Sequence, residues 1–244
     1  VQDFIGSARR TQDFWMGSYI VSYLAWHAMR PVVCALGPDA VLYPALRGQP
    51  FLDADFAALF AAGPEPSSAP PGIASLPNRF VALVPAHDAE KLAREAHAAV
   101  QERWRCMAKD VLTALAVWAD GSWPTSSTWE EQIANCWRVS YAVYPWPEPP
   151  ADTAKGEGSD WALAAVKEYE RLFAQREDDE FDRALPFFLD GGSRQRMVRI
   201  GTAYSRLYEV ADRSIGSTKA TRHFASGREE GEFCTCCGQR AAIT

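Results

Sequence analysis

The stretch that decides the fold is residues 8–35, ARRTQDFWMGSYIVSYLAWHAMRPVVCA. Its bulky apolar side chains recur every three or four positions, which is the spacing of one face of an α-helix. They are Trp15, Tyr19, Tyr23, Trp26, Met29 and Val33. We therefore predict a long amphipathic helix with Ser7 as its N-cap. Pro31 should kink this helix or end it early, and Gly37-Pro38 should stop it.

A second long helix is predicted between Asp88, which is placed to cap the first turn, and Ala119. Its apolar side chains again keep helical spacing: Leu92, Ala96, Val100, Trp104, Met107, Val111, Leu115 and Trp118. Gly121 and Pro124 should end it. Further helices are predicted over residues 129–134, 160–175 and 194–213.

Short apolar or alternating segments indicate strands between these helices. We predict strands at residues 41–44, 79–85 and 137–144, and the end of another at residues 1–5. The resulting order, βαββαβ, is that of ferredoxin-like domains, which include the palm domains of polymerases and nucleotide cyclases.

The predicted fold class is therefore α+β. Residues 1–146 would form a ferredoxin-like, nucleotide-cyclase-like palm with a flexible, Pro/Gly/Ser-rich insertion near residues 61–74. Residues 147–244 would form a helical region that leads into half of a zinc knuckle.

Composition restricts the class of protein. Of the 244 residues, 48% are hydrophobic, which is enough for a sizeable core. The formal net charge of −6 excludes a global basic surface for nucleic acid, so any such contact should be local or made by a partner. We find no apolar run long enough for a membrane span and no signal peptide at residues 1–5, which we expect to lie in the middle of a longer chain. The six cysteines do not form a secreted disulfide pattern, so a cytoplasmic location is expected.

The C-terminal cysteines are the strongest candidates for metal ligands. Cys234 and Cys237 form a C-x-x-C pair that is followed by Gly238, the spacing with which two thiolates reach one zinc ion. Zinc requires four ligands, so this pair supplies half of a site. Two alternatives stay open, namely a redox-active pair and a shifted pair of Cys234 with Cys236. The other three cysteines, Cys34, Cys106 and Cys136, are predicted to be buried free thiols.

Two further motifs resemble catalytic sites, but we interpret both as structural. His87-Asp88 matches the dipeptide of metal-dependent phosphohydrolases, yet further ligands are scarce and Asp88 is expected to cap a helix. Asp190-Gly191-Gly192 has the wrong order for the Gly-Gly-acid hairpin of nucleotide cyclases and is expected to be a loop. No catalytic residue is therefore predicted.

Four strings together carry a resemblance to a known family. They are DFIGSARRTQDFWMGSY at residues 3–19, LRGQP at 46–50, SLPNRF at 75–80 and CTCCGQR at 234–240. In this order they resemble the large palm-domain subunit of type III-B CRISPR effector complexes, the Cmr type. The last string is similar to the zinc knuckle of that family.

The resemblance implies a piece of an RNA-guided antiviral defence protein. In the family, the whole subunit assembles with smaller Cmr-type subunits and guide RNA, and it responds to target RNA by joining ATP, with divalent metal, into cyclic oligoadenylate. The resemblance makes Ser7, Arg9, Arg10, Gly17 and Ser18 candidates for nucleotide binding, since a helix N-terminus with arginines suits phosphate. In the alternative interpretation these residues only pack or are solvated, and the palm is a scaffold for partner subunits and guide RNA.

Overall fold

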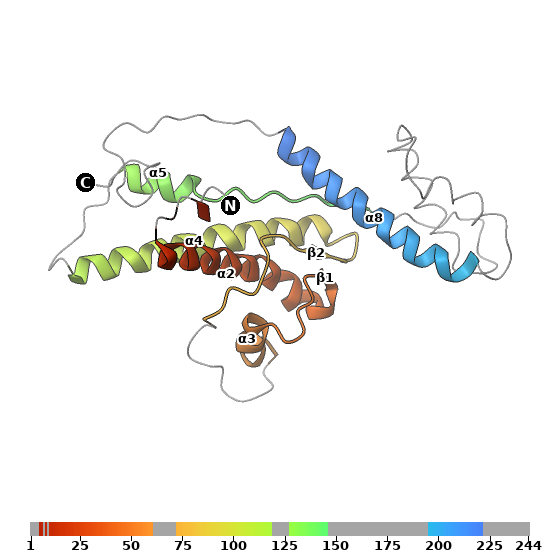
Figure 1. The fold of residues 1–244 in the computed structure, drawn as a ribbon, viewed down its shortest axis with the longest axis horizontal. Helices are drawn as coiled ribbons and strands as arrows, with labels where there is room; N and C mark the ends of the chain where they lie inside the picture. Colours follow the sequence, from red (N-terminus) through yellow and green to blue (C-terminus); the bar gives the residue numbers. More distant parts are fainter. Residues whose placement is uncertain are drawn as a thin grey trace. The chain divides into compact units, whose positions relative to one another are not determined.

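The computed structural model describes residues 5–6, 8, 10–60, 72–118, 127–145 and 195–221, with side chains omitted at 56–60, 127–128 and 195–207. The chain divides into two compact units with a boundary after Val139. In the first, the elements are α2 (Thr11–Leu36), a short 3₁₀ turn (Pro38–Ala40), β1 (Val41–Tyr43), α3 (Pro50–Phe60), β2 (Val81–Ala82), α4 (Ala89–Trp118) and α5 (Ser127–Asn135) (Figure 1). The second contains α8 (Gln195–Ala220).

Helix α2 confirms the first predicted helix and corrects two details of it. The helix starts at Thr11, so the N-cap position is occupied by Arg10, whose backbone is extended, and not by Ser7 as predicted. It also continues through Pro31 to Leu36. The prediction that Pro31 could end the helix early is wrong, because the packing on both sides of Pro31 outweighs the loss of one backbone N–H. The predicted stop is confirmed at Gly37, which has φ +89° and whose N–H donates to the Val33 carbonyl at 2.9 Å.

Helix α4 confirms the second long prediction, because it runs from Ala89 to Trp118. Asp88 precedes its first residue, and the Asp88 carbonyl accepts the Leu92 N–H at 2.8 Å. The predicted short helix is present as α5. The one predicted over 194–213 is present as the longer α8, and the one predicted over 160–175 lies outside the described residues.

The described sheet is much smaller than the palm requires. β1 pairs with β2 in antiparallel fashion, with Val41 opposite Ala82 and Tyr43 opposite Val81. The strand predicted over 79–85 is thus reduced to two residues. The structure shows a mostly helical arrangement with one small antiparallel sheet, and the βαββαβ palm stays a prediction.

The strand predicted over residues 137–144 is absent, because residues 137–145 contain no regular secondary structure. A side chain of α4 binds the backbone here instead, because Gln101 Nε2 donates to the Trp137 carbonyl at 3.1 Å. Just before this segment, Trp104 Nε1 of α4 donates to the Ile133 carbonyl of α5 at 3.1 Å. At the N-terminus, Ile5 is helical rather than the end of a strand. Most of the predicted insertion near 61–74 lies outside the described residues.

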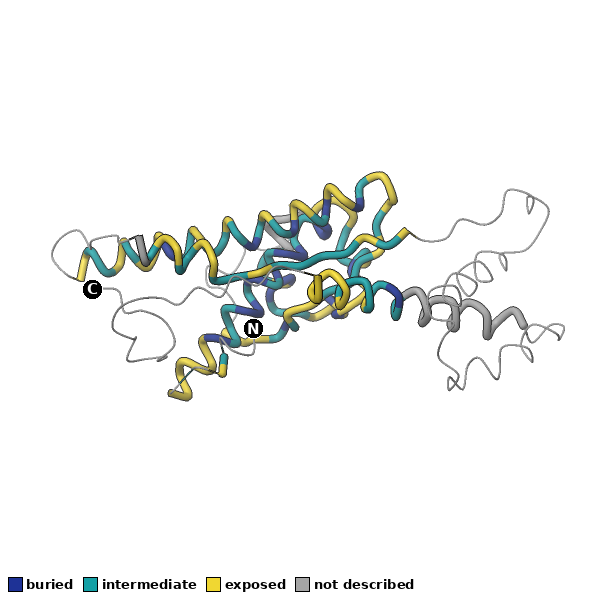
Figure 2. Tube along the Cα trace, turned by 90° about the horizontal axis from the view of Figure 1, so that it is seen from above, coloured by how far each residue is buried: buried dark blue, intermediate teal, exposed yellow. Residues whose placement is uncertain are grey.

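The core lies between α2 and α4 and extends under α3 and the sheet (Figure 2). One cluster joins the C-terminal half of α2 to Leu92 of α4, and it contains Trp26, Met29, Val33, Phe51 and Leu52 among its buried members. Another joins Leu24 and Ala28 to Val100, with Ile20 and Met107 packed against it. The two helices are therefore antiparallel, with the start of α2 beside the later turns of α4.

Two polar anchors attach the segment after α2 to one face of that helix. The Ser22 hydroxyl, which is 1% exposed, accepts backbone N–H bonds from Ser75 at 3.0 Å and from Leu76 at 2.7 Å. One turn further along α2, Trp26 and Arg30 bond to Asp55 of α3. Buried polar groups that are satisfied in this way hold neighbouring segments in one geometry.

Candidate functional site

The predicted nucleotide-binding residues lie on or before the first two turns of α2. Ser7 and Arg9 are outside the described residues. Arg10 is exposed at the N-cap position and its side chain makes no capping hydrogen bond, while Gly17 is buried. The Ser18 hydroxyl donates to the Phe14 carbonyl at 3.1 Å, so the helix backbone already uses it. Within the described residues, Arg10 is therefore exposed and makes no capping bond, whereas the Ser18 hydroxyl is already bonded to the helix.

The predicted zinc ligands, Cys234 and Cys237, lie outside the described residues. Within the part of the chain that the structure describes, no group of three or more His, Cys, Asp or Glu side chains could hold a metal ion. The His87-Asp88 pair is a local contact in which imidazole Nε2 lies 3.1 Å from carboxylate Oδ2. Of the cysteines predicted to be buried, Cys34 is exposed, which corrects that prediction, and Cys106 and Cys136 are partly exposed.

Large apolar side chains are exposed where the start of α2 and the end of α4 lie at the same end of the helical pair. On α2 they are Phe14, Trp15 and Met16, and on α4 they are Val111, Val117 and Trp118. We call these six residues the apolar end. Trp118 is 80% exposed and Phe14 is 55% exposed. Single exposed apolar side chains are common on protein surfaces, whereas a group of large ones is typical of a surface that contacts another molecule.

A ladder of rings follows one face of α2 away from the apolar end. Trp15 stacks on Tyr19 with ring centroids 5.8 Å apart, and Tyr19 stacks on Tyr23 at 6.1 Å. Tyr23 then meets the edge of His27 at 4.7 Å, and the Phe51 ring of α3 packs against both tyrosines. Burial and the neighbouring Tyr23 raise the pKa of Tyr19.

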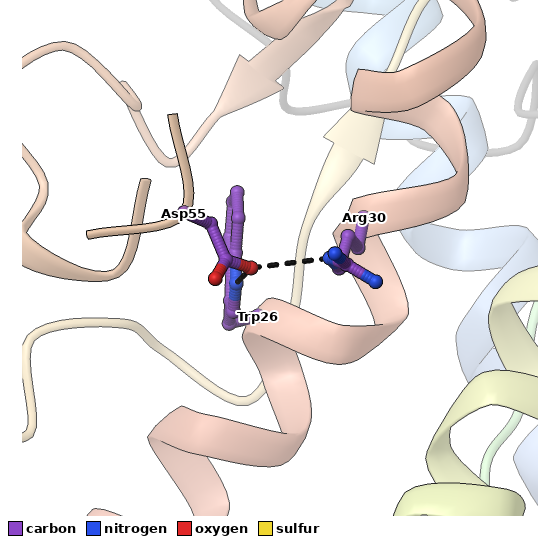
Figure 3. A network of polar contacts seen from close by, with 3 residues as sticks. All are labelled: Trp26, Arg30 and Asp55. Atoms are coloured by element: carbon purple, nitrogen blue, oxygen red, sulfur yellow. Dashed lines mark hydrogen bonds and ion pairs between the residues drawn. The ribbon is translucent and has the colours of Figure 1, made fainter. Parts of the chain in front are cut away.

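Charged groups surround the inner end of this ladder. Trp26 Nε1 donates to Asp55 Oδ2 at 2.8 Å, and Arg30 Nε donates to the same oxygen at 3.1 Å (Figure 3). Arg103 of α4 lies over the Tyr23 ring, 5.2 Å from its centroid. Burial, followed by the Arg103 and Arg30 cations, lowers the pKa of His27 from 6.5 to about 4, although Asp55 opposes the shift.

In the sequence analysis, Trp15, Tyr19 and Tyr23 of α2 were identified but interpreted only as part of the apolar face of a helix. Asp55 and Arg103 were missed because their roles depend on contacts between helices that are far apart in the chain. The i, i+4 repeat of Trp15, Tyr19, Tyr23 and His27 was the available signal, since rings at this spacing stack along a helix.

Comparison with known proteins shows what the first part of the chain is similar to. Residues 1–109 match the family model of CRISPR-associated protein Cmr2, N-terminal. A CRISPR system Cmr subunit Cmr2 from Pyrococcus furiosus is 37% identical over 95 residues, which are 39% of this chain and 10% of that protein. A CRISPR system CMR subunit Cmr2 from Saccharolobus solfataricus is 41% identical over 51 residues, which are 21% of this chain and 5% of that protein.

The chain thus spans a tenth or less of the length of these curated relatives. The matched segment contains α2, α3, the small sheet and most of α4, which is the part that holds both core clusters. Among the described residues, no helix combines the length and apolar character needed to cross a membrane. Residues 1–109 of this chain are thus similar to the N-terminal region of CRISPR-associated protein Cmr2.

Proposed function

We propose that this chain supplies an assembly surface of a Cmr2 subunit and contributes no catalytic residue. In this proposal the full-length subunit works in the cytoplasm with the other Cmr subunits and guide RNA. On binding target RNA it joins ATP into cyclic oligoadenylate, an antiviral signal. The predicted palm of residues 1–146 would then be a scaffold in that subunit.

The observation that carries the proposal is the apolar end. Its aromatic and aliphatic side chains, Phe14 and Trp118 above all, are largely exposed although the two helices beside them are well packed. Large aromatic side chains and methionine are enriched at protein interfaces, where covering them removes apolar surface from water. A helical pair with an apolar end is therefore suited to contact another folded element of the complex.

Reconstitution of the Cmr complex tests this function. Full-length Cmr2 carrying Phe14→Ser and Trp118→Ser is mixed with the other Cmr subunits and guide RNA, and complex formation is followed by native mass spectrometry. We expect at least about tenfold weaker assembly, with a matching loss of cyclic oligoadenylate. Ile73→Ser is the matched control, because Ile73 is 65% exposed but lies outside the apolar end. Equal assembly of both variants would contradict the proposal.

Nucleotide binding at the start of α2 is the second candidate function, and Arg10 is the observation that favours it. Its exposed cation stands at the first turn of a 26-residue helix, where backbone N–H groups attract phosphate. Binding of ATP with Mg²⁺ by full-length Cmr2 should then weaken in Arg10→Gln but not in Ser18→Ala, whose hydroxyl is bonded to the helix. Unchanged binding in both variants would remove this candidate.

Zinc binding by Cys234 and Cys237 also stays a proposal. Two thiolates at this spacing suit one tetrahedral ion, which requires two further ligands. Metal analysis of full-length Cmr2 should show a loss of one zinc equivalent in Cys237→Ser. Cys136→Ser, which removes a thiol outside this pair, should retain the zinc.

A further inference from the structure

Two nitrogen-bearing side chains contact the Tyr23 ring, and a third, Arg30, follows His27 on α2. The Arg103 guanidinium from α4 lies over the ring, and the His27 imidazole meets it edge-on. Arg30 lies one helical turn beyond His27 on α2. Both arginine cations lower the pKa of the His27 imidazole, so each lies within electrostatic reach of that ring.

One buried donor of this group has no hydrogen-bond partner in the described part of the chain. It is Arg103 Nε, whose guanidinium lies over the Tyr23 ring. Arg30 uses Nε for Asp55, and a terminal nitrogen of its guanidinium points away from that carboxylate (Figure 3). A buried N–H group without an acceptor is unusual in a folded protein, so Arg103 Nε needs an acceptor.

The charge balance at this point is positive. Asp55 is the carboxylate that acts on His27, and it already accepts hydrogen bonds from Trp26 and Arg30. Among the described residues, two guanidinium cations and one carboxylate therefore act on His27. With a pKa of about 4, His27 is neutral near pH 7, so it offers one N–H donor without adding a third charge.

We propose that Arg103, Arg30 and His27 form a binding site for a phosphate-class oxyanion, with the Tyr23 ring as its wall. Planar guanidinium groups bind phosphate oxygens with paired hydrogen bonds, and the anion would supply the acceptor that Arg103 Nε lacks. The Arg30 side chain is 41% exposed, so the site can be reached from solvent. The oxyanion can belong to inorganic phosphate, a nucleotide or an RNA backbone.

Phosphate titration of the full 244-residue chain tests the site at constant ionic strength, with the His27 ring protons followed by NMR. Wild type should give a saturable shift, because an anion beside His27 offsets the two cations and raises its pKa. Arg103→Gln should raise the apparent Kd about tenfold or more. Arg94→Gln removes an exposed arginine from the same helix and should leave the Kd within about twofold.

Arg103→Lys keeps the positive charge but lacks the planar guanidinium, so we expect its Kd to lie between those of wild type and Arg103→Gln. If circular dichroism shows that Arg103→Gln is unfolded, Arg103→Lys is used in its place. The same variants are titrated with ATP and with a short single-stranded RNA. The ligand whose affinity depends most on Arg103 identifies the source of the oxyanion. The proposal is overturned if no ligand saturates, or if all three bind wild type and the Arg103 variants alike.

Discussion

Acid should destabilise this protein through His27, and the structure gives the size of the effect. The pKa of His27 is lowered from 6.5 to about 4 in the folded chain. Between these two pH values the imidazole is therefore protonated in the unfolded chain and neutral in the folded chain. The free energy of unfolding should therefore fall as the pH drops from 6.5 towards 4. The difference of about 2.5 units corresponds to roughly 3.4 kcal/mol, which we reduce to about 2 kcal/mol because the imidazole is partly solvated.

Urea unfolding of wild type and His27→Phe between about pH 7 and pH 4.5 measures this effect. Phenylalanine keeps a ring against Tyr23 but cannot be protonated, so the variant should lose about 2 kcal/mol less on acidification. His87→Gln, which removes an imidazole with 81% of its side chain exposed, should follow the wild-type curve. Parallel losses in wild type and His27→Phe would refute the reasoning, because the acid sensitivity would then come from other groups.

Three substitutions test the contacts that position α3, the sheet and the end of α2. Asp55→Asn removes the charge that accepts two hydrogen bonds and should lower the free energy of unfolding by about 1–3 kcal/mol, whereas Asp53→Asn, exposed on the same helix, should change little. Ser22→Ala leaves two backbone N–H groups without their acceptor and should cost about 1–3 kcal/mol, against less than about 0.5 kcal/mol for Ser18→Ala. Gly37→Ala should cost about 1–2 kcal/mol through backbone strain alone, because φ is +89° and an added Cβ meets nothing within 4 Å. Urea unfolding at neutral pH measures all three, and a neutral Ser22→Ala would show that water replaces the hydroxyl.

The two long helices were predictable because their apolar spacing extends over many turns, so single irregularities such as Pro31 do not erase the signal. Helix α3 was missed, although Pro50 at its start and Asp53 in its first turn are typical of a helix N-terminus. Its apolar residues are nearly continuous and show no stripe. The neighbouring segment rich in Pro, Gly and Ser was interpreted as an insertion near residues 61–74, and no element was predicted over residues 50–60.

The strands were predicted less well than the helices. An alternating pattern of apolar and polar residues is compatible with a strand, but it does not identify a neighbouring strand for that segment to pair with. Residues 137–144 alternate, yet Trp137 and Val139 pack against the α2–α4 cluster and the backbone bonds to a side chain of α4. Prediction of the candidate nucleotide-binding residues was limited in the same way, because their contacts could not be seen in the sequence. Ser18 suited a ligand by residue type, whereas its hydroxyl is bonded to the Phe14 carbonyl, and only tertiary structure reveals this kind of competition.

The extent of the family match divides the apolar end into two halves. The match ends at residue 109, and Ala108 is the last buried residue of α4. Beyond it, Val111, Val117 and Trp118 are exposed. The α2 half of the apolar end lies inside the matched region, while the α4 half lies outside it. Under the assembly function proposed above, a surface shared with Cmr2 subunits should therefore depend on Phe14 more than on Trp118. The corresponding single variants in the reconstitution assay would separate a contact shared by the family from one specific to this chain.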